Sequence, residues 1–67
     1  MQIKLKFSNG KSKVFHVKKD STIEDLLKEI GVNIETVIVK MNGKIVPEVE
    51  KLEDNCTLEL IEFVSSG

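Results

Sequence analysis

The sequence predicts an α+β domain in which one mixed sheet of about five strands wraps around one helix. Apolar and polar residues alternate at both ends of the chain, and a one-faced helical pattern lies between them at residues 22–30. Two Asn-Gly pairs, at 9–10 and 42–43, are typical of tight turns. The 67 residues leave room for one domain, so we expect residues 1–64 to fold and residues 65–67 to form a flexible tail.

The amino-terminal residues predict a β-hairpin. Polar residues separate Met1, Ile3, Leu5 and Phe7, which is the pattern of a strand with one buried face. Asn9-Gly10 favours the positive φ angles of a tight turn. Residues 12–18 then form the returning strand, with Phe15 and Val17 facing inward and Val14 and His16 facing outward.

Residues 22–30 predict a short helix. Thr22 precedes two acidic residues that suit the positive end of a helix dipole, and Gly31 is a natural stop. The apolar residues at i, i+3, i+4 and i+7 form one stripe, made of Ile23, Leu26, Leu27 and Ile30. We expect this stripe to pack on one face of the sheet.

The second half of the chain predicts three more strands. Val37, Val39 and Met41 alternate with polar or outward residues, Asn42-Gly43 turns the chain, and a short strand at 45–47 ends at Pro47. Residues 48–56 read as a polar connection. Residues 57–64 form the last strand, which we expect to lie parallel to the first at the centre of the sheet.

The residues that point away from the helix predict a docking surface. If Val39 and Leu60 face inward, the outward residues are Val14, Ile38, Ile61 and Phe63, which could gather into an exposed apolar patch. The alternative is a bulge near Leu60-Ile61 that turns Phe63 inward. The pattern alone favours neither alternative.

The composition limits the classes of function. Ten basic and eleven acidic side chains of both signs are scattered along the chain, so we expect no nucleic-acid partner. No apolar run is long enough to span a bilayer, so we expect a cytoplasmic protein without a membrane partner. One cysteine, Cys56, and one histidine, His16, supply neither a metal centre nor a catalytic set. We therefore expect no enzyme activity.

Two stretches resemble known families. Met1-Gln2-Ile3, Lys6, Gly10-Lys11, Val17, Thr22-Ile23-Glu24 and Ile30 match the start of ubiquitin without a gap. Residues 42–47, residues 52–55 and the Val-x-x-Gly ending resemble the sulfur-carrier proteins of the ThiS and MoaD group, and the short length is more similar to the thiamine-pathway member. The resemblance implies a ubiquitin-like β-grasp fold.

The same resemblance implies a function at the carboxyl end. Gly67 would be adenylated by an E1-like adenylyltransferase of the ThiF/MoeB kind, which consumes ATP, and converted to a thiocarboxylate. A sulfur donor would load it, and thiazole synthase or another acceptor would take the sulfur. Ser65 and Ser66 would be the tether, and Ser66 departs from the family's penultimate glycine. We expect no bound cofactor and a monomer when the protein is free.

Two other functions stay open at this point. The chain could be a ubiquitin-like modifier that is joined through Gly67 to lysines of target proteins. It could also be a β-grasp interaction module that is not conjugated.

Overall fold

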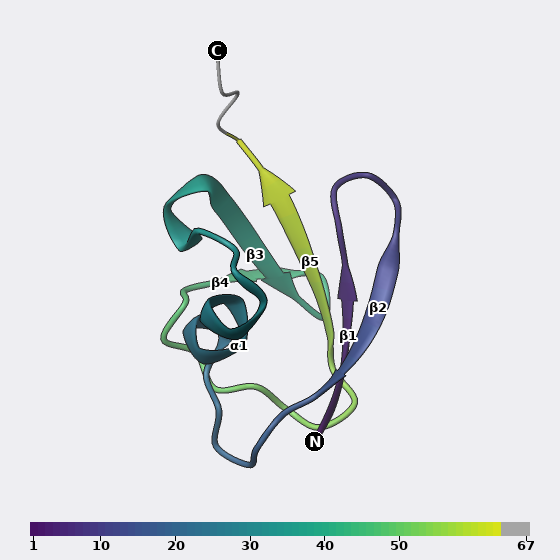
Figure 1. The fold of residues 1–67 in the computed structure, drawn as a ribbon, viewed down its shortest axis with the longest axis vertical. Coiled ribbons are helices and arrows are strands. Elements are labelled where there is room, and N and C mark those ends of the chain that lie inside the picture. The colour runs from purple at the N-terminus through teal and green to yellow at the C-terminus, as the bar shows by residue number, and fades with distance from the viewer. Residues whose placement is uncertain (64–67) are drawn as a thin grey trace.

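The computed structural model describes residues 1–63 and shows one five-stranded sheet with one α-helix across one face (Figure 1). In chain order the elements are β1 (Gln2–Lys6), β2 (Ser12–His16), α1 (Ile23–Ile30), the 3₁₀ turn η1 (Ile34–Thr36), β3 (Val37–Met41), β4 (Lys44–Val46) and β5 (Thr57–Glu62). The strand order is β2-β1-β5-β3-β4, and β1 and β5 are parallel neighbours. The predicted α+β architecture is confirmed.

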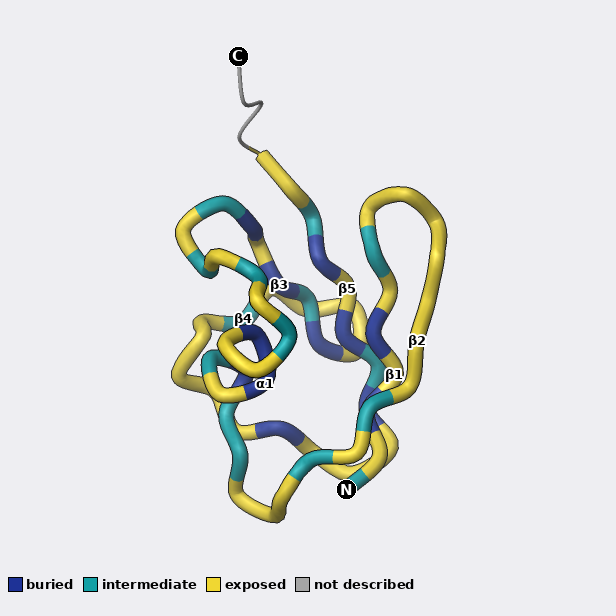
Figure 2. The backbone as a smooth tube through the Cα atoms, in the orientation of Figure 1, coloured by how far each residue is buried: buried dark blue, intermediate teal, exposed yellow. Residues whose placement is uncertain are grey.

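The core lies between α1 and the inner face of the sheet. Six side chains are less than 2% exposed, three from the central strands and three from the helix: Ile3, Leu5, Leu58, Ile23, Leu26 and Leu27. Figure 2 shows the buried segments gathered between the helix and the central strands. The period-two and helical patterns of the sequence therefore meet in one apolar layer.

Both ends of α1 are fixed by local hydrogen bonds. The Asp25 amide donates to Thr22 Oγ1 at 3.2 Å, and the Thr22 amide donates to Asp25 Oδ2 at 3.0 Å. This capping box satisfies two amides at the start of the helix. At the other end Gly31 has a φ of +80°, a left-handed conformation that glycine adopts without steric cost. The predicted helix is confirmed.

The two Asn-Gly pairs form different turns. Asn42 and Gly43 both have positive φ, of 52° and 86°, and they join the paired residues Met41 and Lys44 by a two-residue loop. At the first hairpin only Gly10 has positive φ. There the Phe7 amide donates to the Lys11 carbonyl at 2.7 Å, which leaves a longer loop that bulges. The prediction of a tight turn holds at the second pair and needs this correction at the first.

The connection after β4 is more ordered and less polar than the sequence predicts. Leu52 is 5% exposed and Cys56 is 2% exposed, so both belong to the core. The Leu52 amide donates to the Ser21 carbonyl at 2.8 Å, and the Ile23 amide donates to the Glu50 carbonyl at 3.0 Å. The segment thus closes the core beside the start of α1.

None of the helices formed by residues 1–63 has the length and hydropathy that crossing a membrane requires.

Candidate docking face and carboxyl end

The outer face of the sheet, away from α1, carries apolar residues along the antiparallel strands β3 and β5. Ile38 is exposed there, whereas Ile61 is half-buried. Ile38 on β3 lies directly opposite Ile61 on β5, and Ile38 is 37% exposed. The Phe63 amide donates to the Thr36 carbonyl at 3.2 Å, which extends the ladder by one residue. By alternation Phe63, which is 57% exposed, follows Ile61 on the outer face.

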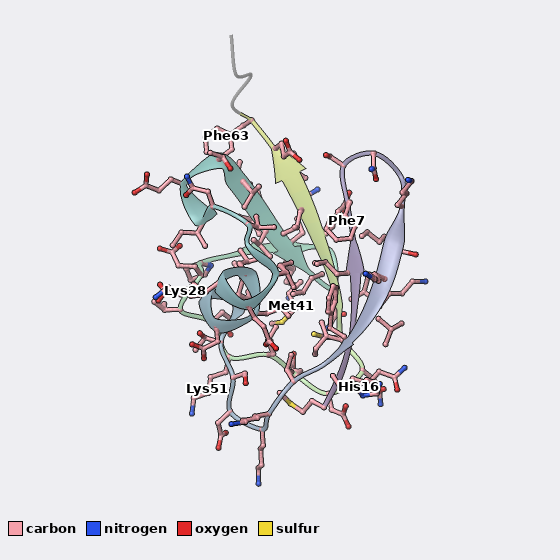
Figure 3. The ribbon with its side chains drawn as sticks, in the orientation of Figure 1. Phe7, His16, Lys28, Met41, Lys51 and Phe63 are labelled. Carbon is pink, nitrogen blue, oxygen red and sulfur yellow. The ribbon has the colours of Figure 1, made fainter. Side chains whose placement is uncertain are left out.

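The pairing of β3 with β5 decides between the two arrangements that the sequence left open. The register runs unbroken from Val37 opposite Glu62 to Met41 opposite Leu58. A bulge would place two residues opposite one, and none occurs in this ladder. Phe63 accordingly stays exposed, beside the start of β3 (Figure 3).

Sequence reasoning missed a fourth residue of this surface. Ile45 on β4 is 69% exposed and lies opposite Lys40, one diagonal step from Ile38. The signal was available, because a two-residue turn at Asn42-Gly43 pairs Met41 with Lys44 and thereby turns Ile45 outward. We name the set the apolar cluster: Ile38, Ile45, Ile61 and Phe63.

Val14 lies apart from the apolar cluster. It is 49% exposed on β2, where its partner is Lys4. Strand β1, with Lys4 and Lys6 on the same face, separates β2 from β5. The structure therefore brings together three of the four predicted docking residues, adds Ile45, and leaves Val14 on the edge strand.

The predicted carrier residues Ser65, Ser66 and Gly67 lie outside the described residues. The strand that precedes them, β5, runs toward the end of the sheet opposite Met1 (Figure 1). Gly67 follows Phe63 by 67 − 63 = 4 residues. An extended chain spans at most about 3.5 Å per residue, so four residues can reach about 14 Å.

The family model of small archaeal modifier protein 2 (SAMP2) matches residues 1–57, from β1 to the start of β5. The chain belongs to this family. It is also similar to the crystal structure of SAMP1 from Haloferax volcanii, with a TM-score of 0.76 and 18% identity over 100% of both chains. That likeness shows a shared ubiquitin-like β-grasp fold, as the sequence predicted.

The single histidine and the single cysteine of this SAMP2-family chain occupy different surroundings. His16 is exposed on the outer side of β2, whereas Cys56 is enclosed in the core. Burial is the main cause that raises the pKa of the Cys56 thiol, so the thiol is held protonated. Across residues 1–63 no group of three or more His, Cys, Asp or Glu side chains could hold a metal ion.

Charge is segregated along this SAMP2-family chain, which corrects the interpretation that both signs are scattered. Residues 1–19 contain six lysines and no acidic residue, a formal charge of +6. Residues 20–67 contain the other four lysines and all eleven acidic residues, and 4 − 11 = −7. A net charge of −1 conceals this division, although a count by segment would have revealed it. The distribution of charge therefore does not exclude a nucleic-acid partner.

A cleft of about 640 Å³ opens between the tip of the first hairpin and the end of β5. It exists because the β1–β5 register ends at Lys6 opposite Glu59, whereas β5 continues to Glu62. Ser8 Oγ donates to Glu62 Oε1 at 3.3 Å across the gap. The charged residues that line the cleft are Lys6, Glu59 and Glu62, so the lining carries both signs of charge.

Proposed function

We propose that this chain acts as a ubiquitin-like carrier through the carboxylate of Gly67, and that the apolar cluster is the surface on which an E1-like adenylating enzyme docks. One observation supports the proposal most directly: Ile61 lies on β5, and Phe63 follows the last residue of that strand, four positions before Gly67 in the sequence. A partner that grips the apolar cluster holds the carboxyl end within about 14 Å, by the reach of four extended residues. Membership of the SAMP2 family supports the same function.

The chemistry of Gly67 requires a partner. A free α-carboxyl group has a pKa of about 3.5, so at neutral pH it is a carboxylate and a poor electrophile. Attack of a carboxylate oxygen on the α-phosphorus of ATP breaks the bond between the α- and β-phosphates, releases pyrophosphate and leaves an acyl adenylate. The activating enzyme supplies ATP and the catalytic groups, and this chain supplies the carboxylate and the docking face.

The acyl adenylate has two candidate fates. Attack by a sulfide-level sulfur donor releases AMP and gives a thiocarboxylate, and the likeness of residues 42–47 and 52–55 to sulfur carriers supports this fate, with thiazole formation as the predicted use. Attack by a lysine amine releases AMP and gives an isopeptide bond, and the description of the family as a modifier protein supports that one.

Intact mass of the protein from its native cells separates the two fates. A gain equal to the exchange of one oxygen for sulfur identifies the thiocarboxylate, and a series of heavier species identifies conjugates. The same mass determines whether the mature protein ends at Gly67, which both fates require. A single unmodified species under all growth conditions contradicts both and favours an interaction module.

The activation step is tested by ATP–pyrophosphate exchange with the cognate activating enzyme. Deletion of Gly67 moves the carboxylate by about 3.5 Å, beyond near-attack distance, so exchange is expected to vanish. The matched variant Ser66→Gly is expected to keep or raise the rate, because it frees the backbone and removes a side chain. Full exchange by the deletion variant, with its denaturation midpoint unchanged, contradicts the proposal.

A further inference from the structure

The sheet formed by residues 1–63 has two edge strands, and they differ in length and charge. One edge is β2, with five residues and no proline. The other is β4, with three residues followed by Pro47. β2 is exposed along most of its length (Figure 2). The longer edge therefore offers more backbone for pairing with an added strand.

The register identifies which backbone groups of β2 point away from the sheet. The ammonium group of Met1 donates to the Val17 carbonyl at 2.7 Å, and the Val17 amide donates to the Met1 carbonyl at 2.8 Å. Val17 thus faces β1, and antiparallel pairing makes alternate residues share that direction. By this alternation the N–H and C=O groups of Ser12, Val14 and His16 point away from β1, in the plane of the sheet, and we call them the outward-facing groups.

Lysines surround these outward-facing groups on both sides of the sheet. On the inner side Lys11 and Lys13 alternate with Phe15, and Lys13 Nζ lies 5.9 Å from the centre of the Phe15 ring. On the outer side Lys4 and Lys6 lie opposite Val14 and Ser12. This edge belongs to the segment of residues 1–19, which contains no acidic residue.

We propose that the free edge of β2 binds an extended acidic segment of a partner protein as an added strand. Its backbone pairs with the outward groups of Ser12, Val14 and His16, and its carboxylates lie beside Lys11 and Lys13. An apolar residue of the segment covers Val14. The lysines at this edge repel basic strands, and a neutral strand would desolvate them without pairing their charge, so the same charges give selectivity for an acidic partner.

This site is independent of the carrier function. It uses neither Gly67 nor the apolar cluster, and β1 and β5 separate it from β3. The exposure of Val14, which the docking face leaves unexplained, is accounted for at this edge. A partner could occupy β2 while an activating enzyme occupies the apolar cluster.

The test uses the full chain and a synthetic peptide of alternating glutamate and valine, with amide hydrogen exchange followed by NMR. The amides of Ser12, Val14 and His16 are expected to gain protection together. The Ile45 amide is the internal control, because the pairing of Met41 with Lys44 points the Ile45 amide out from the other free edge. Protection at Ile45 in place of β2 overturns the proposal.

Two lysine variants test the charge requirement. Lys11→Gln/Lys13→Gln is expected to weaken peptide binding by about three- to tenfold in Kd, as the loss of two cross-strand charge pairs predicts. The matched variant Lys44→Gln/Lys51→Gln removes the same charge elsewhere and is expected to bind as the wild type does. Equal weakening by both pairs shows an effect of net charge alone and overturns the proposal.

Two further probes separate other occupants. An oligouridylate of equal charge is expected to bind without protecting the three amides, and equal protection by it overturns the assignment to a protein strand. Without peptide, protection is expected to be independent of protein concentration. Protection that rises with concentration shows that a second copy of the chain occupies the edge, which also overturns the assignment.

Discussion

The two faces of the sheet are built from the same strands and have opposite properties. On the inner face Leu58 is 0% exposed beneath α1, whereas Ile38 and Phe63 on the outer face are 37% and 57% exposed. Successive side chains of a strand alternate between faces, so each strand contributes to both. This difference predicts that substitutions of exposed outer-face residues change recognition with little loss of stability, whereas substitutions of buried inner-face residues destabilise the whole domain.

The largest effect on stability is expected from Leu26→Ala on the inner side. Leu26 is 1% exposed between α1 and the sheet, and removal of such a side chain costs about 2 to 5 kcal/mol. In a domain of this size that is most of the stability. Chemical denaturation measures it, with Ile38→Ala as the outer-face control. Equal denaturation midpoints for the two variants would contradict the difference in stability between the inner and outer faces.

Leu52→Ala tests whether the inner layer extends into the connection after β4. Leu52 is 5% exposed, so we expect a loss of about 2 to 3 kcal/mol, at the lower end of the range for buried leucines. Glu53→Ala is the control, because the Glu53 side chain is exposed although it is next to Leu52 in the sequence. A Leu52→Ala protein as stable as the Glu53→Ala protein removes Leu52 from the core.

A smaller effect is expected at the start of α1. Thr22→Ala removes the hydroxyl that accepts from the Asp25 amide and should cost about 1 kcal/mol, the usual loss of a helix cap. Thr22→Ser retains the hydroxyl and should retain most of the stability. Thermal denaturation of the two variants checks the difference, and an equal loss in both contradicts the capping role.

Asp25 adds a pH dependence to this cap. Two hydrogen bonds hold the pKa of the Asp25 carboxyl below its ordinary value. The larger effect comes from the Thr22 amide and the smaller from the Thr22 side chain. The pKa of Asp25 is lower in the folded state than in the unfolded state. The contribution of Asp25 to the free energy of unfolding is therefore fully present above the unfolded-state pKa and is lost as pH falls through the folded-state pKa. Asp25→Asn should flatten this acid-side decline, and an unchanged decline contradicts the assignment.

The smallest effect on stability and the clearest effect on binding are expected at Phe63. Phe63→Ala should shift the denaturation midpoint little, because the side chain is 57% exposed. If the apolar cluster binds the activating enzyme, loss of an exposed aromatic anchor should raise KM in the exchange assay at least about fivefold, corresponding to about 1 kcal/mol. Val14→Ala, an exposed residue outside the cluster, is the control. Equal KM values for both variants contradict the docking face.

The two Asn-Gly turns show where prediction from sequence succeeds and where it ends. The pair Asn42-Gly43 forms the expected two-residue turn, and Asn42 is further held because its Oδ1 accepts from the Thr57 amide at 3.2 Å. Among residues 1–63 no distant strand bonds to Asn9, and Asn9 Oδ1 instead accepts from the Lys11 amide at 2.9 Å. An Asn-Gly pair permits a two-residue turn in both hairpins. The two-residue turn occurs at Asn42-Gly43, where hydrogen bonds with β5 also hold the asparagine.

The order of elements, the helical stripe with its cap, and the inward faces of β1, β2, β3 and β5 could be predicted from the sequence, because these features depend on residues close together in the chain. The absence of acidic residues from positions 1–19, which contain six lysines, could also be found by counting along the sequence. Only the tertiary structure placed Ile45 with Ile38 and Ile61, separated Val14 from them, and buried Leu52 beside α1. Those relations depend on strand order and register, which bring together segments that no local pattern connects.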